Sequence, residues 1–248
     1  MPSLPAPHAT TRLLAIALAG ATLWAAPASA DGLPSEEVKR LALEAIRENP
    51  EIVMEAVAIL QAREDEARRA TATEAVVAEA EAMLANAPIL GDPGADVALI
   101  EFFDYNCPYC RRAKPVISEV MEGDPGVRIV GREWPILGEG SVFAARAALA
   151  SQEQGLYEPF HWAMMGMTGR AERDSVLRIA EEVGLDVERL LVDMEAPSID
   201  AHIAESRRIA DLLGITGTPS FVVGETLLPG LVDADTLARA VEAAREAR

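Results

Sequence analysis

The sequence predicts an α/β fold that carries a helical insertion and is preceded by an alanine-rich helical segment. Two apolar, strand-like runs at 97–103 and 127–134 flank a helix that opens at a Cys-x-x-Cys motif. Amphipathic helical patterns then follow from 139 to 214, before the chain returns to short strands. The segment 35–86 has neither glycine nor an aromatic residue, which favours an almost continuous helix.

The composition excludes several classes of protein. The 248 residues are 50% hydrophobic and 25% charged, which is ordinary for a globular chain. Because 40 acidic and 22 basic side chains give a formal net charge of −18, the protein repels nucleic-acid phosphates and anionic lipid surfaces. Its two cysteines are too few for a disulfide framework or a four-cysteine metal site in one chain. We therefore expect no nucleic-acid partner, no cofactor and no metal.

Residues 1–30 have the pattern of a signal peptide. Arg12 precedes an apolar run at 13–26, and a small-x-small cleavage pattern ends at Ala30. The alternative is a membrane anchor, but the run is shorter than the ~20 apolar residues that a spanning helix needs. We expect cleavage after Ala30 and export of the mature chain to an oxidising compartment.

Residues 31–90 form the predicted helical N-terminal segment, which ends before a Gly-Asp-Pro-Gly turn at 91–94. Apolar side chains recur at helical spacing in 38–46, 53–60 and 76–84, and a polar stretch separates the second group from the third. This segment cannot form a core by itself. Its apolar stripes either dock on the rest of the chain or pair with copies of it in a homo-oligomer, and the sequence leaves both possibilities open.

The Cys-x-x-Cys motif carries the predicted chemistry. Cys107 lies where a helix begins, and free amide N–H groups there favour an anion, so we expect a lowered thiol pKa. A thiolate attacks disulfides, and Cys110, one turn further on, can resolve the mixed disulfide. A zinc site would need two more ligands, and a bridge this short would constrain the unfolded chain little. Redox chemistry is therefore favoured, and the arginines at 111–112 are expected on the solvated surface.

A histidine and a group of methionines offer a second interpretation. His161 lies close in sequence to Met164, Met165 and Met167, and imidazole and thioether groups are ligands that suit Cu(I). Methionine at helical spacing is also a common gap-filler between packed helices. We favour packing over a copper site for these residues.

Two segments of the chain resemble a known family. The run at 99–110 resembles the active-site strand and helix start of the DsbA-like thioredoxin-fold oxidoreductases, and 215–221 resembles their cis-proline loop. The resemblance covers residues 91–248, with a helical insertion at about 139–214. The alanine-rich front end is similar to that of the oligomeric ScsC-like branch, which is associated with suppression of copper sensitivity. The resemblance therefore implies a thioredoxin fold with an inserted helical domain.

The resemblance also implies roles for residues around the cysteines. Cys107 would be the attacking thiol and Cys110 the resolving thiol. Glu101 matches the family's buried acid, whose raised pKa would let it accept or relay the proton of Cys110. Its alternative is a solvated carboxylate at the end of a strand.

The cis-proline loop and the two residues between the cysteines form the implied substrate site. Pro219 would be in the cis form beside the disulfide, and the backbone of Thr218 would pair with an extended client segment. Pro108 and Tyr109 would set the environment of the thiols. An ordinary turn proline is the alternative for Pro219.

These observations lead to the hypothesis of an exported, periplasmic protein thiol–disulfide oxidoreductase. The oligomerising front end favours a disulfide isomerase or reductase, because linked redox domains raise the effective concentration of one active site near another. Its partners would be cysteine-containing exported clients and a membrane redox partner that recycles the cysteines. The alternatives are a monomer-like DsbA-type oxidase, and a copper-binding or thiol-based holdase protein without turnover.

The predicted signal peptide can be tested directly. N-terminal sequencing of the exported protein should give a mature chain that starts at Asp31, because the small-x-small pattern ends at Ala30. A mature start inside or before the apolar run at 13–26 would contradict the prediction.

Overall fold

The computed structural model describes residues 34–247, apart from the side chain of residue 69. The predicted signal peptide at 1–30 therefore lies outside the described residues. The chain divides into two compact units after Val57, and each is described by itself. Within the described part of the chain, no helix is both long enough and apolar enough to cross a membrane.

The first unit is helical and leaves its apolar side chains exposed. Helix α1 (Ser35–Glu48) buries none of its residues, and after Pro50 the chain continues as the first turns of α2 (Glu51–Leu84). The exposed apolar side chains of this unit are Val38, Leu41, Leu43, Ile46, Ile52, Val53, Met54 and Val57. Within the described part of this unit, residues 34–57, nothing covers them.

The second unit is built on a five-stranded sheet with the order β1-β3-β2-β4-β5. Its strands are β1 (Ile89–Leu90), β2 (Val97–Phe103), β3 (Val127–Glu133), β4 (Ser220–Val223) and β5 (Thr226–Pro229). The central strands β2 and β3 are parallel, and all other neighbours are antiparallel. Helix α3 (Pro108–Gly123) connects the parallel pair, as the strand–helix–strand pattern predicted.

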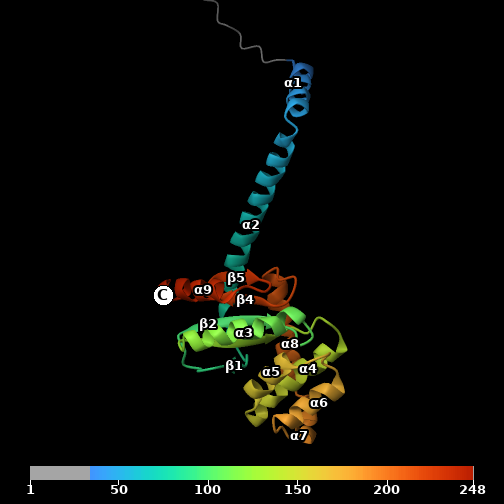
Figure 1. Ribbon diagram of the computed structural model, residues 1–248, viewed down its shortest axis with the longest axis vertical. Helices are drawn as coiled ribbons and strands as arrows, with labels where there is room; N and C mark the ends of the chain where they lie inside the picture. The colour runs from blue at the N-terminus through green and yellow to red at the C-terminus, as the bar shows by residue number, and fades with distance from the viewer. Residues whose placement is uncertain (1–33, 248) are drawn as a thin grey trace, which may run out of the picture. The chain divides into compact units, whose positions relative to one another are not determined.

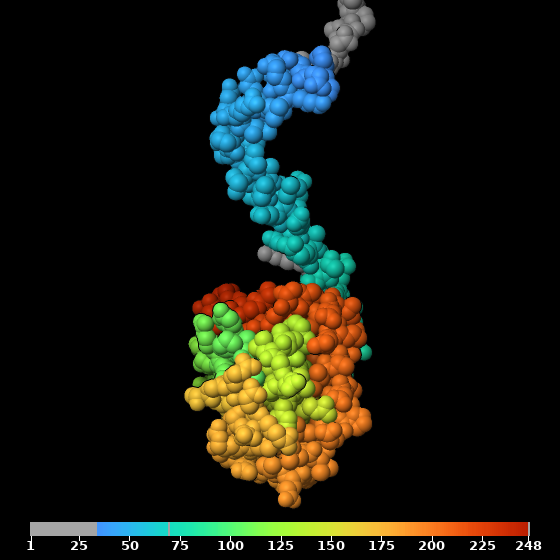
Figure 2. Space-filling model, turned by 90° about the vertical axis from the view of Figure 1, so that its right-hand side faces the viewer, coloured from blue at the N-terminus to red at the C-terminus, as the bar shows by residue number. Residues whose placement is uncertain are grey.

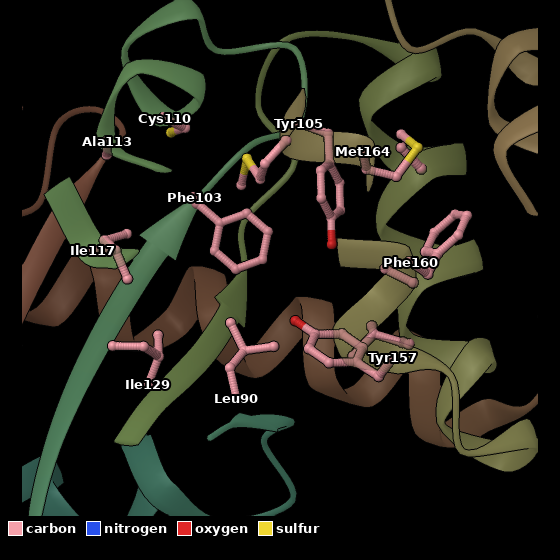
Figure 3. Packing of buried hydrophobic residues seen from close by; sticks show 14 of the residues in the cluster. Leu90, Phe103, Tyr105, Cys110, Ala113, Ile117, Ile129, Tyr157, Phe160 and Met164 are labelled. Atoms are coloured by element: carbon pink, nitrogen blue, oxygen red, sulfur yellow. The ribbon is translucent and has the colours of Figure 1, made fainter. Parts of the chain in front are cut away.

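One face of the sheet packs against α3 and the C-terminal helix α9 (Ala234–Glu246). Leu99, Phe103 and Ile129 of the sheet meet Ile117 of α3 and Leu237 of α9 in one buried cluster. Figure 3 shows part of this packing, and in Figure 2 the red atoms of α9 adjoin the green atoms of α3. The alternation of side chains along a strand leaves the intervening residues for the opposite face.

The opposite face packs against the end of α2 and the end of α8 (Pro197–Leu212). Ile100 and Phe102 of β2 meet Val76 and Met83 of α2, and each of these two α2 side chains is only 1% exposed. Arg208 of α8 also forms an ion pair with Glu79 of α2. The third apolar stripe of the N-terminal segment therefore docks on its own chain, unlike the exposed stripe of the first unit.

The predicted insertion is a group of helices beside the sheet (Figure 1). It comprises α4 (Glu139–Ser151), a short 3-10 turn (Gln152–Gln154), α5 (Tyr157–Gly166), α6 (Arg173–Glu182), α7 (Val187–Asp193) and α8. Helix α4 contacts each of the other four helices. Its buried side chains are mostly alanines, which let neighbouring helices approach closely.

One element escaped the sequence interpretation. Strand β1 pairs antiparallel with β3 through Ile89 opposite Val130 and Leu90 opposite Ile129. A strand of two residues is too short to show an alternating pattern, so periodicity could not reveal it. The mixed α/β architecture with a thioredoxin-like sheet agrees with the fold class that the sequence predicted.

The docking of α2 on the sheet makes a stability prediction. Met83→Ala should lower the free energy of unfolding by roughly 2–5 kcal/mol, because it leaves a cavity in a buried cluster. Leu84→Ala at the neighbouring position is the matched control. The Leu84 side chain is 41% exposed, so its loss should lower the free energy of unfolding by less than about 1 kcal/mol. Urea unfolding of both variants measures the difference. Equal losses would mean that the end of α2 does not belong to the core.

Candidate active site

Cys107 and Cys110 lie at the start of α3, the helix that follows β2. Cys107 has the extended backbone of an N-cap residue, with φ −76° and ψ 118°, and Pro108 is the first residue of the helix. Proline suits this position because its fixed φ is already helical and the first amides of a helix lack partners. Both cysteines are free thiols and both are buried.

The surroundings of Cys107 favour its thiolate. Hydrogen bonding by the Cys110 thiol is the largest cause that lowers the pKa of Cys107 to about 5. Burial opposes this shift. Hydrogen bonds from the Thr218 side chain and from the backbone amides of Tyr109 and Cys110 lower the pKa further. The amide contribution is the one that a cysteine at a helix start predicted.

Cys110 has the opposite preference. Burial is the main reason that its pKa lies above the ordinary thiol value, followed by its hydrogen bond to Cys107 and the charge of Glu101. At neutral pH the pair therefore consists of a thiolate at Cys107 and a thiol at Cys110. Cys107 is therefore the sulfur that can attack a disulfide, since a thiolate attacks disulfides and a thiol does not.

Glu101 lies on β2 beneath the cysteines and is 1% exposed. Its Oε1 has no hydrogen-bond partner within the described residues. Burial, followed by the charges of Cys107 and Glu133, raises the pKa of Glu101 to about 8. The solvated strand-end carboxylate that was the alternative interpretation therefore does not describe this residue.

The cis-proline loop lies against Cys107. The Thr218–Pro219 peptide bond is cis, as the resemblance implied. The Cys107 thiol, when protonated, donates to the Thr218 carbonyl oxygen over 3.1 Å. Tyr109 lies at the surface with 53% of its area exposed, and the Arg112 guanidinium carbon lies 5.4 Å from its ring centroid. The structure thus brings Thr218 to Cys107 and leaves Tyr109 facing solvent.

Two polar side chains near Cys107 bind distant backbone groups: Asp104 binds the segment between β3 and α4, and Asn106 binds the helical insertion. The Asp104 carboxylate accepts from the backbone N–H groups of Ile136 and Leu137 at 2.8 and 2.9 Å. Asn106 accepts from the N–H of Ala171 over 2.7 Å and donates to the carbonyl of the same residue. Sequence reasoning missed both residues, because Asp and Asn before a helix usually signal only a local turn or cap.

The expectation for Arg111 is wrong. Arg111 is partly buried, and its guanidinium donates to the carbonyl of Tyr105 at 2.8 Å and to that of Gly169 in the insertion. No local sequence pattern shows that the Arg111 guanidinium binds these backbone carbonyls. Arg112 remains exposed as expected.

The histidine and methionines of the copper interpretation lie in the core of the insertion. His161, Met164 and Met165 are 1%, 0% and 4% exposed, and the two methionines belong to the main buried cluster. His161 packs against four aromatic rings, those of Phe103, Tyr105, Tyr157 and Trp162. The packing interpretation therefore describes these residues.

A thiolate at a helix start, a buried thiol one turn on and a cis-proline loop beside them define a site for thiol–disulfide exchange. Residues 98–242 match the family model of the DSBA-like thioredoxin domain, which covers more than half of the chain. The chain belongs to this family of thiol–disulfide oxidoreductases.

Solved structures show the same fold. A thioredoxin-like oxidoreductase from Silicibacter pomeroyi DSS-3 is 60% identical, with a TM-score of 0.65 over 66% of this chain and 95% of that one. A linker-deletion mutant of ScsC from Proteus mirabilis is 27% identical, with a TM-score of 0.67 over 89% and 100%. The thiol-disulfide exchange protein alpha-DsbA2 from Wolbachia pipientis is 27% identical, with a TM-score of 0.67 over 71% and 97%. These neighbours agree with the ScsC-like resemblance.

The curated relatives match this chain over only a part of their own length. The Na(+)/H(+) antiporter NhaA of Herminiimonas arsenicoxydans is 32% identical over 159 residues, which are 63% of this chain and 25% of the antiporter. NhaA 3 of Salinispora tropica is 30% identical over 158 residues, 24% of its length. The chain thus spans about a quarter of the length of these relatives.

The asymmetry of the two thiols can be measured. The thiolate absorbance of reduced Cys107 should titrate near pH 5. Cys110→Ala should move this titration to higher pH, because it removes the largest stabilising contact of the thiolate. Cys110→Ser is the matched control, since its hydroxyl can still donate, and it should move the titration less. Titration of Cys110→Ala at the wild-type pH would contradict this assignment.

The buried Glu101 predicts a pH-dependent stability. Because its pKa rises from 4.5 to about 8 on folding, the folded chain keeps a proton that the unfolded chain releases between these pH values. Glu101 therefore destabilises the fold increasingly across this range. Glu101→Gln should match the wild type below pH 4.5 and be more stable at pH 8, by up to about 1.4 kcal/mol per unit of pKa shift.

The comparison uses unfolding in urea at both pH values. Glu119→Gln on the exposed side of α3 serves as the control and should leave the difference between the two pH values unchanged. Equal stability of Glu101→Gln and wild type at pH 8 would show that Glu101 is not held in its neutral form.

Proposed function

We propose that the chain is an exported protein thiol–disulfide isomerase or reductase that acts through Cys107 and Cys110. The observation that carries the redox assignment is the asymmetry of the pair, with a thiolate-favouring Cys107 beside a thiol-favouring Cys110. An asymmetric pair suits a two-step exchange, in which one sulfur attacks and the other resolves.

The exchange proceeds in two balanced steps. The Cys107 thiolate attacks one sulfur of a client disulfide, forming a mixed disulfide and releasing the second client sulfur as a thiolate. Cys110 then loses its proton and attacks Cys107, which releases the first client sulfur and leaves a Cys107–Cys110 disulfide. Two electrons pass to the client. When a different thiolate of the client attacks the client sulfur of the mixed disulfide instead, Cys107 leaves as a thiolate and the client has exchanged its pairing.

Glu101 is the proposed acceptor of the Cys110 proton. Its carboxyl is buried in the same cluster of charges as the two thiols, and its pKa of about 8 lets it gain or lose a proton near neutral pH. The charge of Glu101 also contributes to the raised pKa of Cys110, which indicates that the two groups act on each other.

An extended client segment is proposed to bind along the cis-proline loop, with Thr218 as its backbone partner. A groove of about 1270 Å³ in the second unit includes Thr218 in its lining. The loop 214–218 and the β4–β5 turn contribute much of the remaining wall. Pro108 and Tyr109 are exposed next to Cys107 in the chain, and we propose that they contact the client beside the reacting sulfur.

The direction of exchange is proposed from the first unit. Its exposed apolar side chains, among them Leu41 and Ile46 of α1, have no cover from the described residues 34–57 of that unit. Burial between copies of the chain in a homo-oligomer would remove them from water. Several linked redox sites could then hold and reshuffle one client, which favours an isomerase or reductase over a monomer-like DsbA-type oxidase.

The proposed compartment is the periplasm, and the proposed recycling partner is a membrane redox protein that keeps Cys107 reduced. The signal-like pattern at 1–30 supports export. A similar solved structure from Salmonella enterica serovar Typhimurium, 28% identical with a TM-score of 0.58, is described as a periplasmic thioredoxin-like protein.

Reactivation of a scrambled-disulfide protein by mature 31–248 tests the proposed direction. The wild type should restore the client's activity over many turnovers, and Cys107→Ser should abolish this. Oxidation of a reduced peptide runs in parallel with the same preparations. Oxidation without reactivation would indicate a DsbA-type oxidase, and stoichiometric client binding without turnover would indicate a holdase.

The proposed homo-oligomer predicts a change of mass. Leu41→Glu combined with Ile46→Glu should reduce the mass measured by light scattering to that of a single chain, because buried acids oppose the apolar contact. Val192→Glu is the matched control, since its side chain on α7 is 73% exposed, and it should leave the mass unchanged. A single-chain mass for the wild type would refute the oligomer.

A further inference from the structure

A chain of buried polar side chains runs beneath the redox loop. The Tyr105 hydroxyl lies 3.0 Å from Nδ1 of His161 and also hydrogen-bonds Tyr157. Tyr157 donates to Oε1 of Glu133 over 2.7 Å. Figure 3 shows the Tyr105 hydroxyl directed toward the part of the core in which the Tyr157 hydroxyl lies. This chain leads from β3 to a residue only two positions before Cys107.

The other end of the chain reaches the end of α2. Oε2 of Glu133 lies 3.0 Å from Nε2 of His202 on α8, and Nδ1 of the same histidine lies 3.2 Å from the carbonyl oxygen of Asn86. A carbonyl oxygen can only accept, so Nδ1 donates to it. The remaining contact, between Nε2 and Oε2, is an ion pair when the imidazole is protonated.

One arrangement of hydrogens accounts for the hydrogen bonds from His161 to Glu133. Because Tyr157 donates to Glu133, its oxygen accepts from Tyr105, and the Tyr105 oxygen accepts from Nδ1–H of His161. Nε2 of His161 is then a bare acceptor, and it is the His161 atom without a partner within the described residues. Burial, with a smaller effect from Lys114, lowers the pKa of His161 to about 3, so the ring carries one hydrogen.

A glycine in β3 leaves room for this chain of hydrogen bonds. Gly131 lies two residues before Glu133, and a Cβ atom there would come within 2.6 Å of the Tyr157 hydroxyl. Any larger residue would therefore push Tyr157 away from Glu133. The same glycine is the register partner of Glu101 on β2. Since two residues span about 7 Å along a strand and strands are about 5 Å apart, Glu133 and Glu101 lie on one face within about 8 Å at their backbones.

We propose that Glu133 is a positioning residue of the thiol–disulfide site: its carboxylate anchors the Tyr157–Tyr105 chain beneath Cys107, and its negative charge acts on Glu101. This inference rests on the proposed function for its catalytic consequence. Glu133 touches neither cysteine, so it acts through Glu101 and through the tyrosines.

The electrostatic surroundings support this role. Glu133 is one of the three causes that raise the pKa of Glu101, after burial and Cys107. The other ionisable groups around the two carboxyls are Cys110 on α3, Tyr105 after β2, Arg132 on β3, Tyr157 on α5 and His202 on α8. By opposing ionisation of Glu101, Glu133 makes the Glu101 carboxylate a stronger proton acceptor once it has ionised.

Glu133→Gln separates charge from shape. Glutamine can still accept from Tyr157 and can donate to His202, so the chain of hydrogen bonds persists while the charge is lost. The titration of Glu101, followed by NMR of carbon-13-labelled glutamate and assigned by its absence in Glu101→Gln, should move to lower pH. A shift of roughly 0.3 pH unit or more corresponds to about a twofold change in the ionisation constant.

Two further variants control for a merely structural effect. Glu188→Gln removes an exposed carboxylate from α7 and should leave the Glu101 titration unchanged. Tyr157→Phe keeps the charge of Glu133 but breaks the chain, so it should slow Cys107-dependent client reduction with little change in the Glu101 titration. It also keeps the proposal testable if Glu133→Gln does not fold, because wild-type exchange rates in Tyr157→Phe would overturn the anchoring role.

The pH profile of client reduction links the charge to the reaction. The pH dependence of client reduction that is lost in Glu101→Gln is the part due to Glu101. Glu133→Gln should move that part to lower pH, and it should leave the pH profile of Glu101→Gln unchanged when the two substitutions are combined. An unmoved Glu101 titration, or an equal effect in that background, would overturn the proposal. If the wild type showed no Cys107-dependent exchange, the proposed function would fail, whereas the NMR titration would still decide whether Glu133 acts on Glu101.

Discussion

The stabilisation of a thiolate at the first turn of α3 is the interaction on which the rest of the site depends. Cys107 is almost fully buried, and burial alone would favour its thiol form. The Cys110 thiol and the backbone amides at the helix start outweigh that penalty. These donors are in place only because β2, the loop and α3 hold the two cysteines one turn apart, so the fold itself determines which sulfur reacts.

The rest of the architecture keeps those donors in position. Asp104 binds backbone amides of the segment just before the insertion, and Asn106 binds the backbone of the insertion itself. Arg111 of α3 donates to the carbonyl of Tyr105 in the same loop. Beneath the loop, the Tyr105–Tyr157–Glu133 chain occupies space that Gly131 leaves open. The insertion is thus more than an addition to the sheet, because its Ala171 and Gly169 backbone groups bind Asn106 and Arg111 on either side of Cys107 in the sequence.

The sequence predicted those parts of the site that local patterns encode. The apolar strand, the helix start and the Cys-x-x-Cys spacing located Cys107, and the resemblance added the buried Glu101 and the cis form of Pro219. Contacts between distant segments could not be predicted in this way. Glu133 and His202 are 69 residues apart, and Glu133 ends a strand that also holds Arg128 and Arg132, so its charge gave no distinct local signal.

The reduction potential of the Cys107–Cys110 pair, compared between the folded chain and the chain in denaturant, tests the central claim most directly. If the fold stabilises the Cys107 thiolate, it stabilises the reduced form, and equilibration with glutathione should show a less negative potential in the folded chain. The unfolded chain contains the same two cysteines and is therefore an internal reference. A folded potential equal to or more negative than the unfolded one would contradict the account.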